Sequence, residues 1–192
     1  IYIMIIGLAG KKGSGKDTVA DYLCEQYGFV KYGFGDPIKE IGRIMFDFNS
    51  EQLYGSEKEI VDSNWGITPR EFFQKFGTEY GQFILPTHFP NLFQDINERQ
   101  FWVKRFWVWY SKELEKNPNL KVVVSDIRFM HEFNFIREKE GYVLKIERDL
   151  TKKDSHLSEN ELDEISLGEY NCILYNNGSK EELFQKVKDI LN

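Results

Sequence analysis

The chain has 192 residues, and 41% of them are hydrophobic, which is enough for one globular domain with a substantial buried core. The formal net charge of −6 argues against a general nucleic-acid or anionic-membrane surface, since such a surface needs an excess of basic residues. Cys24 and Cys172 lie far apart without a partner at metal-ligand spacing, so neither a disulfide scaffold nor a zinc site is expected. The longest apolar run, Tyr2–Ala9, is too short to cross a membrane and has no basic segment before it, so we expect a cytoplasmic protein.

The first part of the chain alternates between strand and helix signals. Ile3–Leu8 is a continuous apolar run, which is typical of a strand buried on both faces. Helical spacing follows over Lys16–Tyr27, and a short strand is predicted at Phe29–Tyr32. Asp36 and Pro37 then predict the start of a second helix, with Asp36 as its N-terminal cap and Pro37 in its first turn.

The middle of the chain is predicted to be helical. Thr68 caps and Pro69 opens a helix that the sequence predicts to end near Gly77. A long helix rich in aromatic residues is expected over Asn97–Lys116, because the following Asn117-Pro118 stops it.

The last part of the chain returns to alternating strands and helices. The predicted elements are a buried strand at Val122–Val124, a helix from Asp126 to Glu140, strands at Tyr142–Glu147 and Cys172–Tyr175, and a final helix capped by Ser179. Strands separated by helices favour a parallel sheet with helices on both faces. The expected fold class is therefore α/β, with three layers and five parallel strands, and ligands are expected at the carboxyl ends of the strands.

A glycine-rich segment follows the first strand and matches the phosphate-loop pattern Gly-x-x-x-x-Gly-Lys. It reads Gly10-Lys11-Lys12-Gly13-Ser14-Gly15-Lys16-Asp17-Thr18. Glycines let backbone N–H groups turn toward phosphate oxygens, and the next helix adds the positive end of its dipole. Lys16 would reach the β and γ phosphates. Asp17 replaces the Ser or Thr that commonly binds Mg²⁺ after the Lys, with Thr18 next, and a carboxylate is also a good oxygen ligand for this ion.

A phosphate loop alone leaves a switch, a motor and a kinase as alternatives. Thr151–Asp154 fits the base-reading pattern of GTPases, but the Asp-x-x-Gly element expected after an earlier strand is missing. A small-molecule kinase needs several cations, because two phosphorylated substrates bring their negative charges together. The cations near loops and first turns are Lys12, Lys16, Lys39, Arg70, Arg128 and Arg148. On an acidic chain, these residues together indicate a focused anion site.

Several further motifs occur in a set order along the chain. They are Gly10–Thr18 with Ala20-Asp21, Gly35-Asp36-Pro37-Ile38-Lys39, Arg70-x-x-x-Gln74-x-x-Gly77-Thr78-Glu79, Trp102-Val103, Ser125-Asp126-x-Arg128, His156-x-Ser158-Glu159 and Asn176-Asn177-Gly178. In this order and spacing the chain resembles the deoxynucleoside monophosphate kinases of bacteriophages and large DNA viruses, over most of its length. Gln82 departs from the family pattern, which has Arg there, and places the family's phosphate contact at that position in question.

The resemblance implies a P-loop kinase fold in a single domain, residues 1–192. A phosphate-binding core would comprise 1–36 and 119–192, a helical insert of about 37–116 would bind the nucleoside monophosphate, and a lid would span about 148–168. The implied reaction is the phosphorylation of deoxynucleoside 5′-monophosphates to diphosphates with ATP and Mg²⁺, in the host cytoplasm if the source is a virus. A small-molecule kinase similar to animal phosphomevalonate kinase and a non-enzymatic nucleotide-dependent switch remain alternatives.

The implied ATP site combines the phosphate loop with two later loops. Its residues are Lys12, Gly13, Ser14, Gly15, Lys16, Asp17, Thr18, Arg148 and Asn177, and the Mg²⁺ ligands are Asp17 and Asp126. Arg148 would close on the ATP phosphates from the lid. Asn177 would approach the adenine, although a plain strand-to-helix turn also explains Asn176-Asn177-Gly178.

The implied monophosphate site draws on the helical insert and on one strand end. Its residues are Lys39, Arg70, Gln74, Gly77, Thr78, Trp102, Asp126 and Arg128. Arg70 would clamp the phosphate with its forked donors and Lys39 would meet the same phosphate, but a solvated helix-surface charge is the alternative for Arg70. Gly77-Thr78 is either a simple helix end or an approach to the sugar or base, and Trp102 either stacks on the base or belongs to the core.

The implied catalytic residues are Lys16, Asp126 and Arg128. Asp126 comes at the end of a strand, where a Mg²⁺ ligand belongs, and Arg128 could balance charge during transfer; an ion pair between the two is the alternative. A monophosphate is largely dianionic at neutral pH, because its second pKa is about 6, so its oxygen can attack without a general base. The many aromatic residues leave a homodimer surface and an ordinary core open as alternatives.

Overall fold

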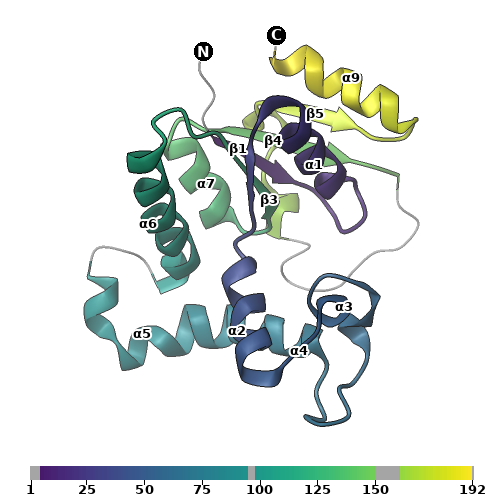
Figure 1. Ribbon diagram of the computed structural model, residues 1–192. Helices are drawn as coiled ribbons and strands as arrows, with labels where there is room; N and C mark the ends of the chain where they lie inside the picture. The colour runs from purple at the N-terminus through teal and green to yellow at the C-terminus, as the bar shows by residue number, and fades with distance from the viewer. Residues whose placement is uncertain (1–4, 95–97, 150–160, 192) are drawn as a thin grey trace. The chain divides into compact units, whose positions relative to one another are not determined.

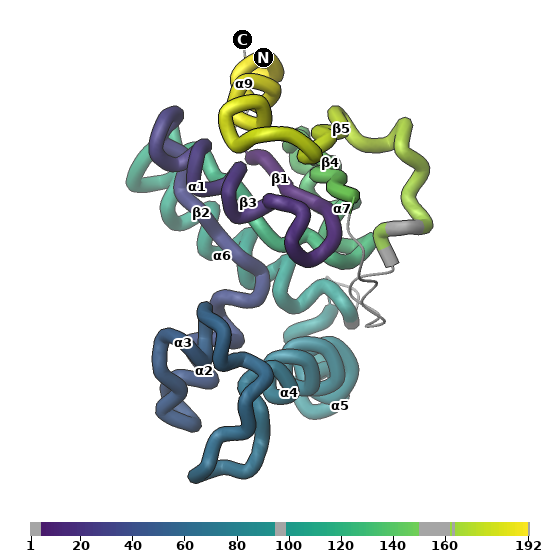
Figure 2. Tube along the Cα trace, turned by 90° about the vertical axis from the view of Figure 1, so that its right-hand side faces the viewer, coloured from purple at the N-terminus to yellow at the C-terminus, as the bar shows by residue number. Residues whose placement is uncertain are grey.

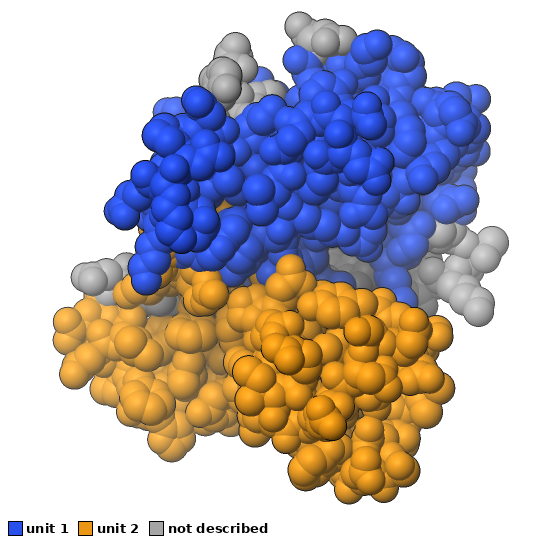
Figure 3. All heavy atoms as spheres, viewed as in Figure 1, with its two compact units in different colours: residues 1–33, 109–192 blue, residues 34–108 orange. Residues whose placement is uncertain are grey.

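A computed structural model describes residues 5–94, 98–149 and 161–191. The chain forms two compact units, one built from residues 1–33 and 109–192 and the other from residues 34–108 (Figure 3). Most of the expected lid, residues 150–160, lies outside the described residues, as do Thr151–Asp154 and His156. In the part of the chain that the structure describes, no helix is long and apolar enough to cross a membrane.

The first unit contains a sheet of five strands, all parallel, in the order β2-β3-β1-β4-β5 (Figure 1). The strands are β1 Ile5–Ala9, β2 Val30–Tyr32, β3 Val122–Ile127, β4 Tyr142–Glu147 and β5 Cys172–Tyr175. The fully buried pattern of β1 explains its continuous apolar sequence, because both faces of the strand are covered. The expected five-stranded parallel α/β sheet is confirmed.

Helices cover both faces of this sheet. They are α1 Lys16–Tyr27, α7 Met130–Glu138 and α9 Lys180–Leu191. α1 and α9 lie side by side (Figures 1 and 2), and Ile6 and Leu8 of β1 share one apolar core with them. Gly7 points the other way, since alternate strand residues face opposite sides. A side chain there would strike Ile127 of β3 and would contact Ile136 of α7 at 3.5 Å. The unit is therefore a three-layer α/β sandwich.

The second unit is helical and has its own apolar core. Its elements are α2 Asp36–Phe46, α3 Ser50–Leu53, α4 Pro69–Gln74, a π-helix over Lys75–Ile84, α5 Leu85–His88, short 3-10 turns at Ser56–Glu59, Pro90–Phe93 and Glu98–Gln100, and the first half of α6 Phe101–Lys116. Ile38, Phe48, Leu53, Phe72 and Trp102 form the buried centre of the core. Thr68 caps α4 as predicted, its hydroxyl accepting a hydrogen bond from the backbone N of Glu71 at 3.0 Å.

Two local predictions in the second unit are wrong. Asp36 is not an N-terminal cap: it is the first residue of α2, Gly35 precedes the helix, and the Asp36 carboxylate binds Lys39 instead. Gly77 does not end a helix, because the chain continues from α4 through the π-helix into α5. Asp36 and Gly77 are residue types that often mark helix ends, but in the folded unit each of them lies within a helix.

Two predicted helix starts also shift. Asp126 belongs to β3, which runs on to Ile127, so the following helix starts only at Met130. The long helix predicted from Asn97 begins as α6 at Phe101, after a 3-10 turn, and Asn97 itself lies outside the described residues. Ser179 caps α9 as predicted, its hydroxyl accepting from the backbone N of Glu182 at 3.2 Å.

Candidate active site

The loop between β1 and α1 depends on its glycines. Gly10, Gly13 and Gly15 have φ values of 143°, 80° and 109°, which side-chain-bearing residues rarely adopt. A side chain at Gly10 would strike the carbonyl oxygen of Ile146, and one at Gly15 would come within 2.5 Å of the Asn176 amide nitrogen. The backbone can therefore wrap into an anion-binding loop only with glycine at these positions.

The Lys16 ammonium is held by the loop itself. Its Nζ donates to the carbonyl oxygen of Gly10 at 2.6 Å and to that of Lys11 at 2.9 Å. The Asn176 side chain supports the same loop from the β5–α9 turn, because its Nδ2 donates to the Ser14 carbonyl at 2.7 Å. The lysine that the sequence assigns to phosphate binding is thus positioned by backbone atoms. Lys12 and Gly13 are exposed, and Thr18 is half-buried at the start of α1.

A cavity of about 220 Å³ opens beside this loop, within the first unit. It is lined by Gly10, Lys11 and Ser14, by residues 145–149 at the end of β4, and by Leu162, Tyr170, Tyr175 and Asn177. The Ser14 side chain is buried, and its Oγ has no hydrogen-bond partner among the described residues. A buried hydroxyl beside a cavity is costly unless a ligand or water satisfies it, so this site suits a polar ligand.

Asn177 connects the two later loops of the cavity. Its Oδ1 accepts from the backbone N of Asp149 at 2.9 Å, and its Nδ2 donates to the Asp149 carboxylate at 2.9 Å. Both ends of the amide are thereby used to fix the chain next to Arg148. This contact was not predicted from the sequence, which offered a plain turn or an adenine contact for Asn177.

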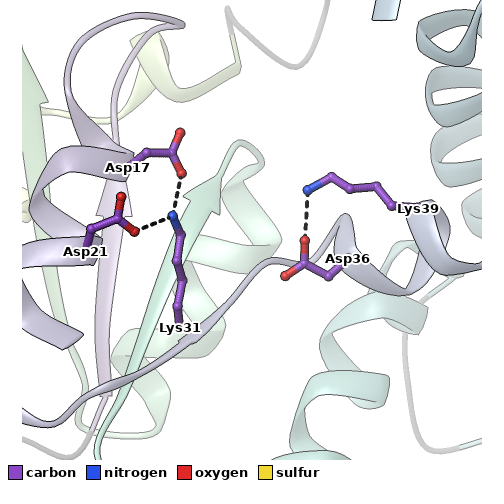
Figure 4. Close-up of polar contacts among 5 residues, drawn as sticks. All are labelled: Asp17, Asp21, Lys31, Asp36 and Lys39. Carbon is purple, nitrogen blue, oxygen red and sulfur yellow. Dashed lines mark hydrogen bonds and ion pairs between the residues drawn. The ribbon is translucent and has the colours of Figure 1, made fainter. Parts of the chain in front are cut away.

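Asp17 points toward β2. Its carboxylate is 81% exposed and lies 2.9 Å from Lys31 Nζ, which also binds Asp21 at 2.9 Å (Figure 4). Desolvation lowers the pKa of Lys31, but the hydrogen bonds that Lys31 donates to the two carboxylates outweigh it, so the pKa is raised. The Asp17 carboxylate is the kind of oxygen ligand that Mg²⁺ prefers, but in this arrangement its Oδ1 is paired with Lys31.

Asp126 is half-buried at the carboxyl end of β3, as expected. Among the described residues, no group of three or more acidic, His or Cys side chains could hold a metal ion.

Glu132 is a buried acid that no sequence motif marked as a site residue. Its Oε2 accepts from the backbone N of Arg128 at 2.8 Å and from that of Phe129 at 3.1 Å. Burial and the nearby negative charge of Asp126 raise the pKa of Glu132 to about 8. A signal was available: a Glu three residues after a helix start commonly binds back to the backbone there.

The two cations assigned to the monophosphate lie in the second unit, each paired with an acid. Lys39 Nζ lies 2.8 Å from the Asp36 carboxylate (Figure 4) and over the Tyr54 ring, 4.7 Å from its centroid. Arg70 Nε lies 3.0 Å from the Glu59 carboxylate. α2 and α4, which carry Lys39 and Arg70, pack against each other. Both cations are partly buried, which distinguishes them from freely solvated surface charges.

Gly77 and Trp102 are joined by a hydrogen bond within the packed core. The Trp102 indole N–H donates to the Gly77 carbonyl at 2.7 Å, and the ring lies where a side chain at Gly81 would be. A side chain at Gly77 would come within 2.7 Å of Ile38. Trp102 is only 6% exposed, so its place is in the core of the unit, which was one of its two sequence interpretations. Gln74 and Thr78 are half-buried on the same continuous helix.

Gln82, the departure from the family pattern, is buried. Its Oε1 accepts a hydrogen bond from Arg99 Nε at 3.3 Å. Arg99 therefore brings a guanidinium group next to the position where the family pattern has Arg. Nothing in the sequence marked Arg99, because the two residues are distant along the chain.

Comparison with known proteins identifies the family. A family model described as deoxynucleotide monophosphate kinase matches residues 4–66 and 43–187. The chain is 39% identical to "Putative deoxynucleotide monophosphate kinase" of Acanthamoeba polyphaga mimivirus, over 96% of this chain and 94% of that protein. It is 25% identical to deoxynucleotide monophosphate kinase of Enterobacteria phage T4, over 97% and 98% of the two chains. It is also 28% identical to dephospho-CoA kinase of Fusobacterium nucleatum, over 97% and 96%.

The family match covers most of the chain, and the relatives are matched over nearly their full lengths. The phosphate loop, its lysine and the parallel sheet agree with this assignment. The chain is thus a phosphotransferase and belongs to the deoxynucleotide monophosphate kinase family.

Proposed function

We propose that this enzyme transfers the γ-phosphoryl group of ATP to a deoxynucleoside 5′-monophosphate, giving a deoxynucleoside diphosphate and ADP. The observation that carries the proposal is the glycine loop between β1 and α1, which holds the Lys16 ammonium at an anion-binding backbone. Family membership supports the choice of acceptor. Transfer is direct, because the acceptor phosphate is a dianion and needs neither a covalent enzyme intermediate nor a general base.

ATP is assigned to the first unit. Its phosphates would bind the backbone N–H groups of residues 12–15 together with Lys16 and Thr18. Its nucleoside part would enter the cavity beside Arg148 and Asn177. The unsatisfied Ser14 hydroxyl offers a hydrogen bond to this ligand. As the lid arginine, Arg148 would help to exclude water that would otherwise hydrolyse ATP.

Mg²⁺ is assigned to Asp126 and Asp17. When bound, the ion neutralises phosphate charge and orients the transferring group. Asp126 offers its carboxylate at the carboxyl end of β3, and Asp17 contributes directly or through water once it exchanges its contact with Lys31. Arg128 would balance negative charge during the transfer.

The deoxynucleoside monophosphate is assigned to the second unit. Arg70 and Lys39 would take its phosphate in exchange for Glu59 and Asp36, since a dianion competes well with a single carboxylate. The half-buried Gln74 and Thr78 would supply polar contacts to the nucleoside. Because Trp102 is buried, it shapes this unit from within, through its bond to Gly77.

The test is ADP release from ATP and Mg²⁺ with each acceptor offered separately. The acceptors are the four deoxynucleoside monophosphates, a ribonucleotide, phosphomevalonate and dephospho-CoA, and the diphosphate product is identified by chromatography. Turnover with at least one deoxynucleotide, abolished in Lys16→Ala, is the expected result. Turnover with only another acceptor overturns the substrate assignment, and ATP binding without any acceptor-dependent turnover favours a switch or binding module.

A further inference from the structure

Two residues of the proposed transfer site, Asp126 and Arg128, lie on one short stretch of chain. Asp126 is near the end of β3, and Arg128 follows the strand before α7 begins at Met130. Their side chains can take part in transfer only if this stretch has a fixed backbone conformation. Misplacement of a reacting group by about 1 Å can cost on the order of 100-fold in rate.

The carboxyl group of Glu132 on the next helix helps to hold this stretch. Glu132 Oε2 accepts the backbone N–H groups of both Arg128 and Phe129, at 2.8 and 3.1 Å. In return, the Phe129 carbonyl accepts the backbone N–H groups of Glu132 and Phe133, each at 3.1 Å. Hydrogen bonds therefore run in both directions between the stretch Arg128–Phe129 and the first turn of α7.

The helix that carries Glu132 is itself firmly anchored. Phe133 and Ile136 of α7 are completely buried, and α7 packs against β1 and β4. A group attached to this helix has little freedom to move. The turn at Arg128 and Phe129 is thus fixed relative to the sheet whose strand β1 leads into the phosphate loop.

We propose that Glu132 is a positioning residue of the transfer site, whose buried carboxyl group fixes the backbone that presents Asp126 and Arg128. This inference rests on the proposed function, since that function gives the two residues their roles. Glu132 does not contact substrate in this proposal and acts only through the backbone N–H groups that it accepts.

Burial makes Glu132 more than a simple helix cap. Helix-terminal N–H groups can be satisfied by water at little cost, whereas a carboxyl group that is 4% exposed loses its own hydration. Burial and the nearby charge of Asp126 raise the pKa of this carboxyl group. A glutamine has the same shape, no charge and the same accepting oxygen, and is therefore the matched replacement.

The experiment compares Glu132→Ala, Glu132→Gln and Glu138→Ala with the wild-type enzyme. Glu138 lies exposed on the same helix and serves as the control. Glu132→Ala should lower kcat by about 10- to 100-fold while the KM for ATP changes less than about threefold, because the phosphate loop is untouched. Glu132→Gln should keep kcat within about threefold of wild type, and Glu138→Ala should leave it unchanged. Wild-type kcat in Glu132→Ala, or equal loss in the Gln and Ala variants, overturns the proposal.

Amide hydrogen exchange of the ligand-free protein reads the same contact without any activity. Peptides covering residues 125–132 should exchange faster in Glu132→Ala and at the wild-type rate in Glu132→Gln; unchanged exchange in the Ala variant overturns the clamp. If Glu132→Ala does not fold, Glu132→Asp, shorter by one methylene, should show the faster exchange and the lower kcat. A wild-type enzyme inactive on every deoxynucleotide overturns the proposed function instead, while the exchange result still reports on the clamp.

Discussion

The two units hold the ionisable groups of their proposed sites in different ways. In the first unit, Lys16 is bound by backbone carbonyl groups and Glu132 binds backbone N–H groups. In the second unit, Lys39 and Arg70 are each bound by the carboxylate of another side chain. Asp17 with Lys31 shows that the first unit also has side-chain pairs, at the exposed start of α1.

The difference predicts how each unit responds to a ligand. Groups fixed by the backbone are already in place before the ligand binds, which reduces the cost of organising the site. Cations paired with carboxylates must exchange one anion for another, so their acidic partners act as competitors of the incoming phosphate. Substitutions in the first unit should therefore mainly affect turnover, and those in the second unit should mainly affect monophosphate binding.

The largest effect is expected for Lys16→Ala. Removing an ammonium that stabilises the transferring phosphates should lower kcat by at least about 1,000-fold, similar to the loss of other charge-stabilising groups in phosphoryl transfer. Steady-state ADP release measures the loss, and Lys188→Ala on the exposed face of α9 is the matched control. A kcat within tenfold of wild type would remove Lys16 from the transfer step.

Arg70→Ala tests the second unit. A hydrogen-bonded charge contributes about 1.5–3 kcal/mol, so the KM for the monophosphate should rise by roughly 10- to 100-fold, with the KM for ATP nearly constant. Initial rates at varied concentrations of each substrate separate the two constants. Equal changes in both KM values would contradict the assignment of Arg70 to the acceptor, and Arg43→Ala, an exposed cation of α2, provides the control.

The sequence predicts the first unit better than the second for a physical reason. Apolar runs and glycines report the strands and the phosphate loop locally, and α1, β4 and β5 have the predicted bounds. The sharp turn at Gly15 is needed by the loop itself as well as by Asn176. Local signals and tertiary packing agree there.

In the second unit, contacts between residues override the local helix-end signals of the sequence. Gly77 is a common helix-end residue, but it lies within a continuing helix, where a side chain would come within 2.7 Å of Ile38 and where its carbonyl accepts from Trp102. Asp36 is a good cap by type, but Lys39 one turn later takes its carboxylate. The pairs Arg70–Glu59 and Gln82–Arg99 join residues distant in sequence, so no single-sequence pattern reports them.

Glu132 predicts a pH dependence of stability in the first unit. Its pKa is raised in the folded state, so the folded protein binds this proton more tightly than the unfolded chain, and the resulting stabilisation is lost as pH rises from about 4.5 toward 8. Glu132→Gln has no carboxyl group to titrate at this position, so its stability does not fall with pH in this way. Its advantage over wild type in unfolding free energy should grow by up to about 1.4 kcal/mol per pH unit in this range. Urea unfolding at pH 6, 7 and 8 measures the difference, with Glu138→Gln as control; a constant difference would contradict the shifted pKa.

The smallest effect, and the most direct test of the contrast between the units, is expected for Glu59→Gln. This substitution leaves Arg70 in place but removes the carboxylate that competes with the substrate phosphate. Because partly exposed ion pairs contribute about 0–1 kcal/mol, the KM for the monophosphate should fall by no more than about fivefold, while kcat stays within about twofold. Glu57→Gln on the same 3-10 turn is the control. A rise in the KM for the monophosphate would show that Glu59 orients Arg70 for the substrate, and the second unit would then be as preorganised as the first.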